Sequence, residues 1–460
     1  MDSNTKAARF FEGLKGKRVA FCGIGRSHMP LMGLFQQKGA VVSARDKRQL
    51  EDLGENGRQL QALGVKLHLG ESYLQGMDED IIFRTPGMRF HLPELEAARQ
   101  RGQAVTSELE IFFDLCPCKT YAVTGSDGKT TTTSVIAEFL KAEGKAVHLG
   151  GNIGKPLLPE IGGIGPGDCA VAELSSFQLI SMRQSPHVAV VTNLSPNHLD
   201  MHKDMQEYID AKRNIYLHQD AFSRTVLNAD NAITAGFAPE VRGDAWLFSR
   251  KAAPARGVWC DGEAIYVNGE KVLAVRDIKI PGWHNVENYM AAIGAVWGDV
   301  SPENIRKVAC EFSGVEHRAE FVRELDGVKY YNDSIASSPT RTISGTLSLY
   351  QEKIVLICGG YDKHIPYTPL GPVICDKVKA LVLLGATGPK IEEAVKAAPS
   401  YAPGAPELLH ASSMEEAISL ARQAAAPGDV VSLSPASAAF DMYPNFEVRG
   451  RHFKEIVNSL

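Results

Sequence analysis

The stretch from residue 121 to 133, YAVTGSDGKTTTT, decides the fold class of this 460-residue chain. Its opening, YAVTG, is an apolar run that predicts a buried strand, and a helix is expected to begin at about Lys129. Gly125 and Gly128 lie in the loop between them and let its backbone curl, so that N–H groups and the helix N-terminus face a bound phosphate. This order of strand, glycine-bearing loop and helix predicts an α/β fold with a phosphate-binding loop.

The residues after the second glycine indicate nucleotide binding at this loop. Lys129 can reach the β- and γ-phosphates, and the Thr130 hydroxyl can ligate Mg²⁺. Val123 stands where the common phosphate-loop pattern has its first glycine, so the motif here is the shorter G-x-x-G-K-T-T. The alternative is a helix N-cap in a polar turn that holds no ligand.

Two further apolar runs, CAVAEL at 169–174 and HVAVVTNL at 187–194, predict strands buried on both faces of the same sheet. Polar residues end both runs at the carboxyl edge, where ligands bind in open α/β sheets. Glu173 is either a Mg²⁺ ligand there or a solvated cap. His198 is either a metal ligand or a structural histidine. The polar residues after the second run are Asn193, Asn197, His198 and Asp200.

Ahead of this core, the chain predicts a Rossmann-like segment with a parallel sheet. Its expected strands, which alternate with helical patterns, lie at 18–24, 40–46, 80–84 and 103–107. The first strand ends in Gly23-Ile-Gly25, the opening of a dinucleotide fingerprint, and Asp46 falls about 20 residues on. His28 occupies the place of the third glycine, which argues against a tightly packed NAD site. The turn either holds a pyrophosphate or is unused.

Beyond the core, the pattern changes twice. Between 224 and 283, short strands with hairpin signals predict a small antiparallel addition, followed by a helix from about 284 to 297. The final segment opens with a hairpin over 319–333, and its further strands are expected at 353–360, 379–388 and 428–437. We therefore expect three domains, at 1–115, 116–313 and 314–460.

The composition argues against several classes of protein. The chain has 49 Lys and Arg against 54 Asp and Glu, a formal net charge of −5, so it lacks the basic character of nucleic-acid or membrane binders. No apolar run approaches the roughly 18 residues of a membrane span, and the N-terminus lacks a signal-peptide core. Eight cysteines are too sparse for a disulfide framework, and Cys116-Pro-Cys118 has no second pair for zinc. We expect a cytoplasmic protein.

Five motifs, in order, resemble those of the Mur ligases, a family of ATP-dependent amide ligases in peptidoglycan synthesis. They are TGSDGKTTTT (124–133), GNIGKP (151–156), TNLSPNHLDMH (192–202), PGWHNVENYMAA (281–292) and VEHR (315–318). The resemblance itself covers essentially the whole chain. ELSSFQL (173–179) and NFEVRG (445–450) resemble the member that adds D-glutamate. The resemblance implies a Rossmann-like N-terminal domain, a central phosphate-loop ATPase-like domain with a small antiparallel addition, and a Rossmann-like C-terminal domain.

Positions that match the family motifs take implied roles. ATP would be held by Gly125, Ser126, Asp127, Gly128, Lys129, Thr130, Thr131, Asn285, Asn288, Arg318 and Asp333. Mg²⁺, as two ions, would be held by Thr130, Glu173, His198 and Lys212. The catalytic residues would be Lys129, His198 and Lys212. The family carbamylates the lysine at the position of Lys212, whereas spacing alone predicts a surface lysine on a helix.

The resemblance also implies the substrates, UDP-N-acetylmuramoyl-L-alanine and D-glutamate. The uridine diphosphate would be lined by Gly25, Arg26, Ser27, Lys47, Arg48, Thr85 and Gly87, muramoyl-alanine by Asn152, Ser175 and Gln178, and D-glutamate by Ser337, Lys363 and Phe446. Two departures affect the last set. Ile335 stands where some members have a lysine, and Ala439 where some have a serine, with Ser437 two residues away.

The implied reaction passes through an acyl phosphate, which the D-glutamate amine attacks, and it releases ADP and phosphate. Three alternatives remain: another ligase of the same family, a folylpolyglutamate synthase, and, from a different class, a phosphate-loop ATPase that makes no bond. The phosphate loop and His28 argue against an NAD-dependent oxidoreductase. We expect a monomer that binds neither nucleic acid nor membrane.

Overall fold

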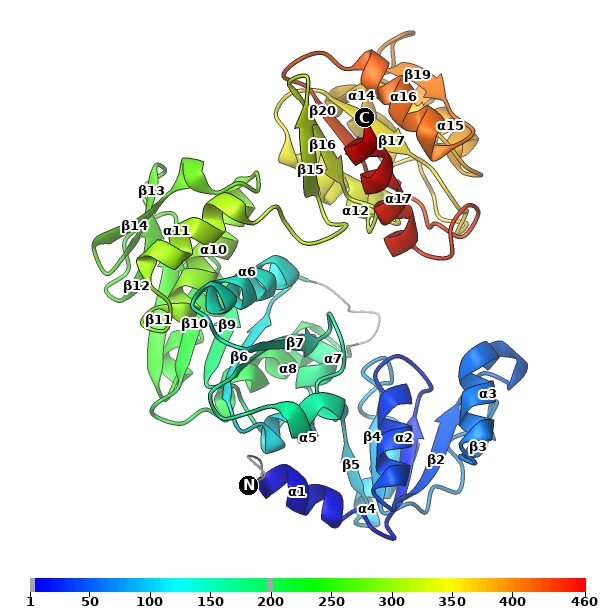
Figure 1. The fold of residues 1–460 in the computed structure, drawn as a ribbon, viewed down its shortest axis with the longest axis vertical. Coiled ribbons are helices and arrows are strands. Elements are labelled where there is room, and N and C mark those ends of the chain that lie inside the picture. The colour runs from blue at the N-terminus through cyan, green and yellow to red at the C-terminus, as the bar shows by residue number, and fades with distance from the viewer. Residues whose placement is uncertain (1–4, 197–201) are drawn as a thin grey trace. The chain divides into compact units, whose positions relative to one another are not determined.

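The computed structural model describes residues 5–196 and 202–460 and contains three β-sheets with helices packed on them (Figure 1). The chain forms two compact units. The first unit comprises Met1–Asp277 and Val286–Cys310, and the second comprises Ile278–Asn285 and Glu311–Leu460. Two sheets lie in the first unit and one in the second, which confirms the predicted α/β class.

The first sheet is parallel throughout, as predicted, in the order β3-β2-β1-β4-β5. Its strands are β1 (Arg18–Cys22), β2 (Val41–Asp46), β3 (Lys66–Leu69), β4 (Ile81–Arg84) and β5 (Ala104–Thr106). The helices around it are α1 (Thr5–Glu12), α2 (Met29–Gln37), η1 (Glu51–Leu53), α3 (Gly54–Ala62), α4 (Pro93–Gln100) and α5 (Glu108–Leu115). The sequence pattern gives no strand at β3, because this edge strand is only partly buried and has no apolar run.

The central sheet runs in the order β14-β13-β12-β11-β10-β9-β6-β8-β7. Its strands are β6 (Lys119–Thr124), β7 (Val147–Gly151), β8 (Cys169–Glu173), β9 (Val188–Val191), β10 (Arg224–Asn228), β11 (Asp244–Ser249), β12 (Gly257–Cys260), β13 (Ala264–Val267) and β14 (Glu270–Ala274). The helices are α6 (Lys129–Ala142), η2 (Leu158–Gly163), α7 (Ser176–Leu179), α8 (Met205–Leu217), α9 (Ala232–Ala235), η3 (Ala238–Glu240), η4 (Val275–Asp277), α10 (Trp283–Val296) and α11 (Pro302–Glu311). Every residue of β8 and β9 is buried, which confirms the prediction for these two strands.

The antiparallel addition predicted over 224–283 is wrong in its first half. Strand β10 pairs with β9 in parallel, β11 with β10, and β12 with β11, so the parallel sheet continues through these strands. Antiparallel pairing is confined to β12, β13 and β14. The sequence hides the crossover between β10 and β11, because its helix α9 has only four residues and is too short to show a helical period.

The third sheet, in the second unit, runs in the order β15-β16-β20-β17-β18-β19. Its strands are β15 (Glu320–Leu325), β16 (Val328–Asn332), β17 (Ile354–Cys358), β18 (Val378–Leu383), β19 (Glu407–His410) and β20 (Val430–Leu433). The helices are α12 (Pro339–Ser344), α13 (Thr346–Leu349), α14 (Leu370–Lys377), α15 (Gly388–Lys396), α16 (Met414–Ala424) and α17 (Phe446–Ser459). The predicted hairpin is present as β15 and β16, and β16, β20 and β17 are parallel. The carboxyl ends of these three strands therefore share one edge.

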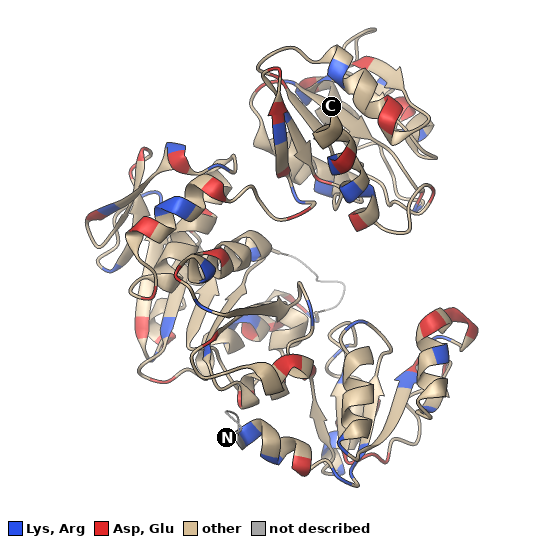
Figure 2. Cartoon of the chain, viewed as in Figure 1, with Lys and Arg blue, Asp and Glu red and all other residues tan. Residues whose placement is uncertain are grey.

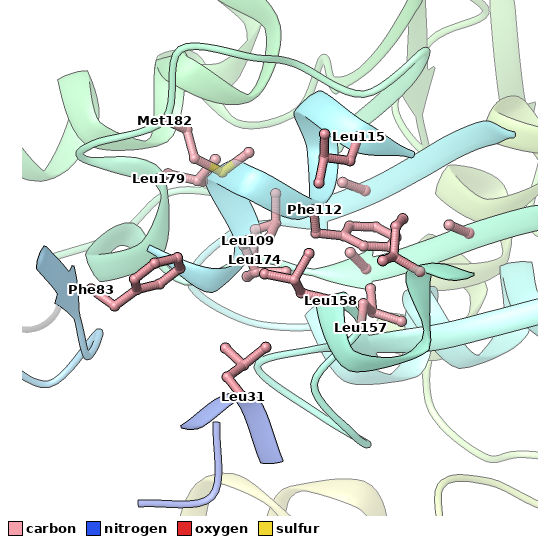
Figure 3. Packing of buried hydrophobic residues seen from close by; sticks show 14 of the residues in the cluster. Leu31, Phe83, Leu109, Phe112, Leu115, Leu157, Leu158, Leu174, Leu179 and Met182 are labelled. Carbon is pink, nitrogen blue, oxygen red and sulfur yellow. The ribbon is translucent and has the colours of Figure 1, made fainter. Parts of the chain in front are cut away.

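A buried apolar cluster joins the first two sheets within the first unit (Figure 3). Leu31 and Phe83 enter it from α2 and β4, Leu109 and Phe112 from α5, and Leu174 from the end of β8. Full burial of a side chain of this size stabilises the fold by about 1.5–3 kcal/mol. Helix α5 thus connects the two sheets through a shared core.

Charged residues of both signs are spread along the elements of both units (Figure 2). This distribution agrees with the near balance of 49 basic and 54 acidic residues. Within the described ranges, no helix is both long and apolar enough to cross a membrane.

Glu108, at the start of α5, is a buried carboxylate that is 7% exposed. Its Oε1 accepts hydrogen bonds from the backbone N–H groups of Leu157 (2.8 Å) and Leu158 (2.7 Å). Burial raises the pKa of Glu108 to about 7, although these hydrogen bonds oppose the shift. The folded chain therefore holds this proton more tightly than the unfolded chain, in which the pKa is about 4.3. Its contribution to the free energy of unfolding must fall as the pH rises from about 4.5 to about 7.

We expect Glu108→Gln to flatten this pH dependence, because glutamine cannot ionise and its amide oxygen still accepts both N–H groups. In the wild type, this carboxyl should remove about 3 kcal/mol from the free energy of unfolding over that pH range. Denaturant unfolding at several pH values measures the difference, with Glu138→Gln, at the surface of α6, as the control. Equal slopes in the wild type and E108Q would contradict the raised pKa.

Candidate functional site

The loop between β6 and α6 has the backbone that its two glycines predicted. Gly125 has φ 151° and Gly128 has φ 77°, both positive. A Cβ on Gly125 would clash with Thr192 Oγ1, and one on Gly128 would clash with Asn288 Oδ1. The loop is therefore fitted closely between the end of β9 and helix α10.

Residues after β9 fix the middle of this loop. Ser126 N donates to Asn193 O (2.8 Å), and Asp127 N donates to Asn193 Oδ1 (3.0 Å). Thr192 Oγ1 donates to Asp127 O (2.6 Å), and Ser126 Oγ donates to Ser195 O (3.0 Å). The loop conformation is thus set by the protein itself, which preorganises it for a phosphate.

Three polar side chains meet beside the loop at the carboxyl edge of the sheet. Thr130 Oγ1 donates to Glu173 Oε2 (2.6 Å), and Asn152 Nδ2 donates to Glu173 Oε1 (2.7 Å). Glu173 is only 1% exposed. Lys129 Nζ donates to the carbonyls of Gly125 and Ser126, both at 2.9 Å. The structure therefore brings these predicted site residues together.

Lys212 is buried, so the surface position predicted from spacing alone is wrong. It lies on α8, is 2% exposed, and its Nζ donates to Thr124 Oγ1 (3.0 Å) and to Gly125 O (3.0 Å). Burial and, next, the charge of Lys129 lower the pKa of Lys212 well below its usual value. The buried face of α8 consists of Tyr208, Ala211, Lys212, Ile215 and Tyr216. A lysine within an apolar stripe of helical period was the available signal.

The donor set at this edge fits Mg²⁺, since the Thr130 hydroxyl and the Glu173 carboxylate are hard oxygen ligands 2.6 Å apart. No group of three or more His, Cys, Asp or Glu side chains is placed to hold a metal among the residues that the structure describes. His198, like Asn197 and Asp200, lies outside the described residues.

The loops predicted to line a uridine diphosphate follow β1, β2 and β4, and β1 pairs with both of the other strands in the first sheet. Asp46 Oδ2 accepts from Ile24 N (2.7 Å) and from Arg48 Nη2 (2.8 Å), so these two side chains brace the loop that contains Gly25. Thr85 follows β4, and its methyl group packs so closely on Gly23 that a Cβ there would lie 2.6 Å from it. The other residues predicted for this end are Arg26, Ser27, Lys47 and Gly87.

His28, in the place of the third glycine of the dinucleotide fingerprint, is a buried neutral histidine. It is 1% exposed, and its Nδ1 lies 2.9 Å from Gly23 O. Burial lowers its pKa to about 4. The ring thus fills the space that a tightly packed dinucleotide site keeps open with glycine.

The residues predicted for muramoyl-alanine border Glu173. Ser175 and Gln178 form a capping box at the start of α7, with Gln178 N donating to Ser175 Oγ (3.3 Å) and Ser175 N donating to Gln178 Oε1 (2.8 Å). Asn152 N donates to Glu173 O (2.8 Å). All three residues therefore lie at the same carboxyl edge as the phosphate loop.

In the second unit, Asp333 is buried (4% exposed) and braces a turn. Its carboxylate accepts from Thr346 Oγ1 (2.7 Å), Ser434 Oγ (3.0 Å) and Ala319 N (3.2 Å). Burial raises its pKa to about 6. Ala319 has a positive φ of 43° and follows the exposed Arg318, so Asp333 helps to hold the backbone that presents this arginine.

The acceptor candidates Ser337, Lys363 and Phe446 also lie in the second unit, after β16, after β17 and at the start of α17. Ser437 is 1% exposed, and its hydroxyl is engaged by Tyr367 OH (2.9 Å) and Thr387 Oγ1 (2.7 Å). The Ser437 hydroxyl is therefore already hydrogen-bonded within the protein, so it is not available to contact a substrate carboxylate in place of the serine that some members have at position 439.

Helix α10 carries the two predicted nucleotide-base residues one turn apart. Asn288 Oδ1 accepts from Thr132 Oγ1 (3.2 Å), and Asn285 Nδ2 donates to Pro281 O (2.5 Å). Asn288 thus links α10 to α6, the helix that the phosphate loop opens.

Comparison with known proteins shows which family the whole chain resembles. Residues 123–296 match the Mur ligase middle domain, and residues 317–437 match the Mur ligase glutamate ligase domain. A UDP-N-acetylmuramoylalanine–D-glutamate ligase of Acetivibrio thermocellus is 52% identical over 464 aligned positions that cover 99% of both chains. The chain belongs to the Mur ligase family. The enzyme of the same name from Clostridium novyi is 49% identical over 98% of both chains.

A solved Mur ligase structure shows the same fold at low sequence identity. UDP-N-acetylmuramate–alanine ligase MurC of Thermotoga maritima matches 96% of this chain and 99% of its own, with a TM-score of 0.58 and 19% identity. The three-sheet Mur ligase architecture is thereby confirmed, and so is the resemblance to the D-glutamate-adding member.

Proposed function

We propose that this Mur ligase joins D-glutamate to UDP-N-acetylmuramoyl-L-alanine, using ATP and releasing ADP and phosphate in peptidoglycan precursor synthesis. The structural observation that carries the proposal is the meeting of Lys129, Thr130, Glu173 and Lys212 at the mouth of the phosphate loop. Full-length identity of about half with D-glutamate ligases supports the choice of acceptor.

The chemistry explains why cations and hard oxygens gather at this edge. A carboxylate resists attack by an amine because its leaving group would be oxide, and phosphorylation replaces that group with phosphate. The γ-phosphoryl and the substrate carboxylate are both anionic, so Lys129 would neutralise part of their charge and orient the γ-phosphate. The amine of D-glutamate then attacks the acyl carbon, and the C–O bond to phosphate breaks.

Mg²⁺ would be held by Thr130 and Glu173, with His198 and Lys212 as further ligands. When bound, the ions offset the repulsion between carboxylate and phosphate. The proposal is supported by the hydroxyl and carboxylate oxygens present beside the loop.

Lys212 would enter this site as a carbamate. Its nitrogen would add to carbon dioxide and lose a proton, which turns a buried amine into an anionic oxygen ligand. The burial of Lys212 next to Gly125 and Thr124 supports this proposal, because an unmodified ammonium would place a second cation beside Lys129 without a carboxylate of its own in hydrogen-bond contact among the described residues.

The remaining roles follow the motifs. We propose that the loops after β1, β2 and β4 bind the uridine diphosphate. Asn152, Ser175 and Gln178 would bind muramoyl-alanine, and Ser337, Lys363 and Phe446 would bind D-glutamate. From their motifs, Asn285, Asn288, Arg318 and Asp333 would bind ATP. The domain boundaries at 115/116 and 313/314, a monomeric state and a cytoplasmic location also belong to this proposal.

Phosphate release tests the proposal. With ATP and Mg²⁺, we expect release to require both UDP-N-acetylmuramoyl-L-alanine and D-glutamate. Release that needs neither substrate would contradict ligation and leave an ATPase, whereas release restored by a different amino acid would contradict the acceptor.

A further inference from the structure

Arg449, on α17, is a buried arginine in the second unit that is 3% exposed. Its Nε donates to Ser334 Oγ (3.0 Å), and its Nη2 donates to Ser334 O (2.9 Å) and Ser437 O (3.1 Å). Its Nη1 donates to Ala438 O (2.9 Å). All four acceptors are uncharged oxygens. The charge of Asp441 acts on the guanidinium without a direct ion pair. Burying a cation whose hydrogen bonds all go to neutral oxygens is costly, so packing alone does not account for this side chain.

The acceptors lie in loops at the carboxyl edge of the third sheet. Ser334 follows β16, Ser437 and Ala438 follow β20, and these strands are neighbours. The loop after β17 is tied to the β20 loop by backbone hydrogen bonds. Gly360 in that loop lies against the guanidinium, since a Cβ there would be 3.1 Å from Arg449 Nη1. One guanidinium thus lies where three loops meet.

Three of the elements around Arg449, namely the β16 loop, the β17 loop and α17 itself, carry a residue proposed for D-glutamate. Ser337 lies three positions after Ser334, Lys363 three positions after Gly360, and Phe446 three positions before Arg449. Ser334 Oγ also donates to Phe446 O (2.8 Å), which ties the β16 loop to the start of α17. Burial lowers the pKa of Arg449 to about 10, so the guanidinium remains charged at neutral pH.

We propose that Arg449 is a positioning residue for the acceptor amino acid. It fixes the β16 and β20 loops relative to one another and packs against Gly360 in the β17 loop, and its charge favours an acceptor with an acidic side chain. Its bonds go to protein oxygens, so it acts through the loops and its field rather than by touching the substrate. This inference rests on the proposed function, which assigns D-glutamate to Ser337, Lys363 and Phe446.

Kinetics of two Arg449 variants tests the inference. Arg449→Lys keeps the charge but lacks the planar fork that bridges two loops, and Arg449→Gln loses both. We expect the KM for D-glutamate to rise about tenfold in R449K and about a hundredfold in R449Q, with kcat changed less than about threefold. The KM for ATP should stay at the wild-type value in both variants.

Arg323→Gln is the matched control. Arg323 Nη1 donates to Val457 O (3.2 Å) and Asn458 O (3.1 Å), at the opposite end of α17. It anchors the same helix away from the acceptor loops, so R323Q should lower stability without raising the KM for D-glutamate.

Two results would overturn the inference: a KM for D-glutamate that is unchanged in R449K and R449Q, or one that rises equally in R323Q. If R449Q does not fold, the KM of R449K for D-glutamate still tests the inference, because this variant retains the buried charge. A wild-type enzyme whose phosphate release ignores D-glutamate would instead refute the proposed function, so the two failures can be told apart.

Discussion

Replacing Lys129 with methionine should remove phosphoryl transfer while leaving the fold in place. In the structure the lysine donates to two loop carbonyls, from which it can turn to a γ-phosphate. Methionine keeps the length of the side chain but not the cation that offsets the charge of the transferring group. We expect kcat to fall by about a thousandfold or more. Phosphate release under saturating substrates measures the loss.

Lys141→Met is the control for this experiment, because Lys141 lies on the same helix and pairs at the surface with Glu138 (2.7 Å). It should keep wild-type kcat, since a surface ion pair contributes at most about 1 kcal/mol to stability. A K129M enzyme that retained a tenth of wild-type activity would show that Lys129 does not serve the phosphate.

Removing the amine of Lys212 should lower kcat by as much as removing the amine of Lys129. Arginine keeps a cation at this position but cannot be carbamylated, and methionine keeps only the bulk. If the carbamate is the functional group, Lys212→Arg and Lys212→Met should both lower kcat by about a thousandfold. Substantial activity in K212R would mean that a cation, rather than an anionic oxygen ligand, is required.

Carbon-13 NMR gives a readout of Lys212 that does not depend on activity. Wild-type protein equilibrated with ¹³C-labelled carbon dioxide should show one slowly exchanging carbamate carbonyl signal. The same signal should be absent from K212R and present in K141M. Its presence in K212R would place the carbamate on a different amine.

The strongly patterned parts of the fold could be predicted from sequence. Strands β8 and β9 are unbroken apolar runs because both of their faces are covered, and the phosphate loop has glycines at the two positions with positive φ. Strands β3 and β19 are short and partly exposed, so they leave no apolar run to detect. The parallel crossover into β11 was missed because its helix has a single turn.

Some residues of the candidate site could likewise be predicted from the sequence, and others could not. Lys129 and Thr130 follow the glycine loop directly, so local sequence was enough to propose them. Lys212 is 83 positions beyond Lys129, and only the packing of α8 against β6 brings it to Gly125. Arg449 lies in the NFEVRG motif, but the sequence assigned no role to it, because that role depends on loops that meet only in the folded sheet.

The most direct test of the central claim is the identity of the amino acid that enters the product. The enzyme would be given ATP, Mg²⁺, UDP-N-acetylmuramoyl-L-alanine and an equimolar mixture of D-glutamate, L-glutamate, L-alanine, glycine and meso-diaminopimelate, and the nucleotide product would be analysed by mass spectrometry and chiral hydrolysis. The account predicts a product heavier by one glutamyl residue, with D configuration. A product that carries another amino acid, or ADP formed with no heavier product, would contradict it.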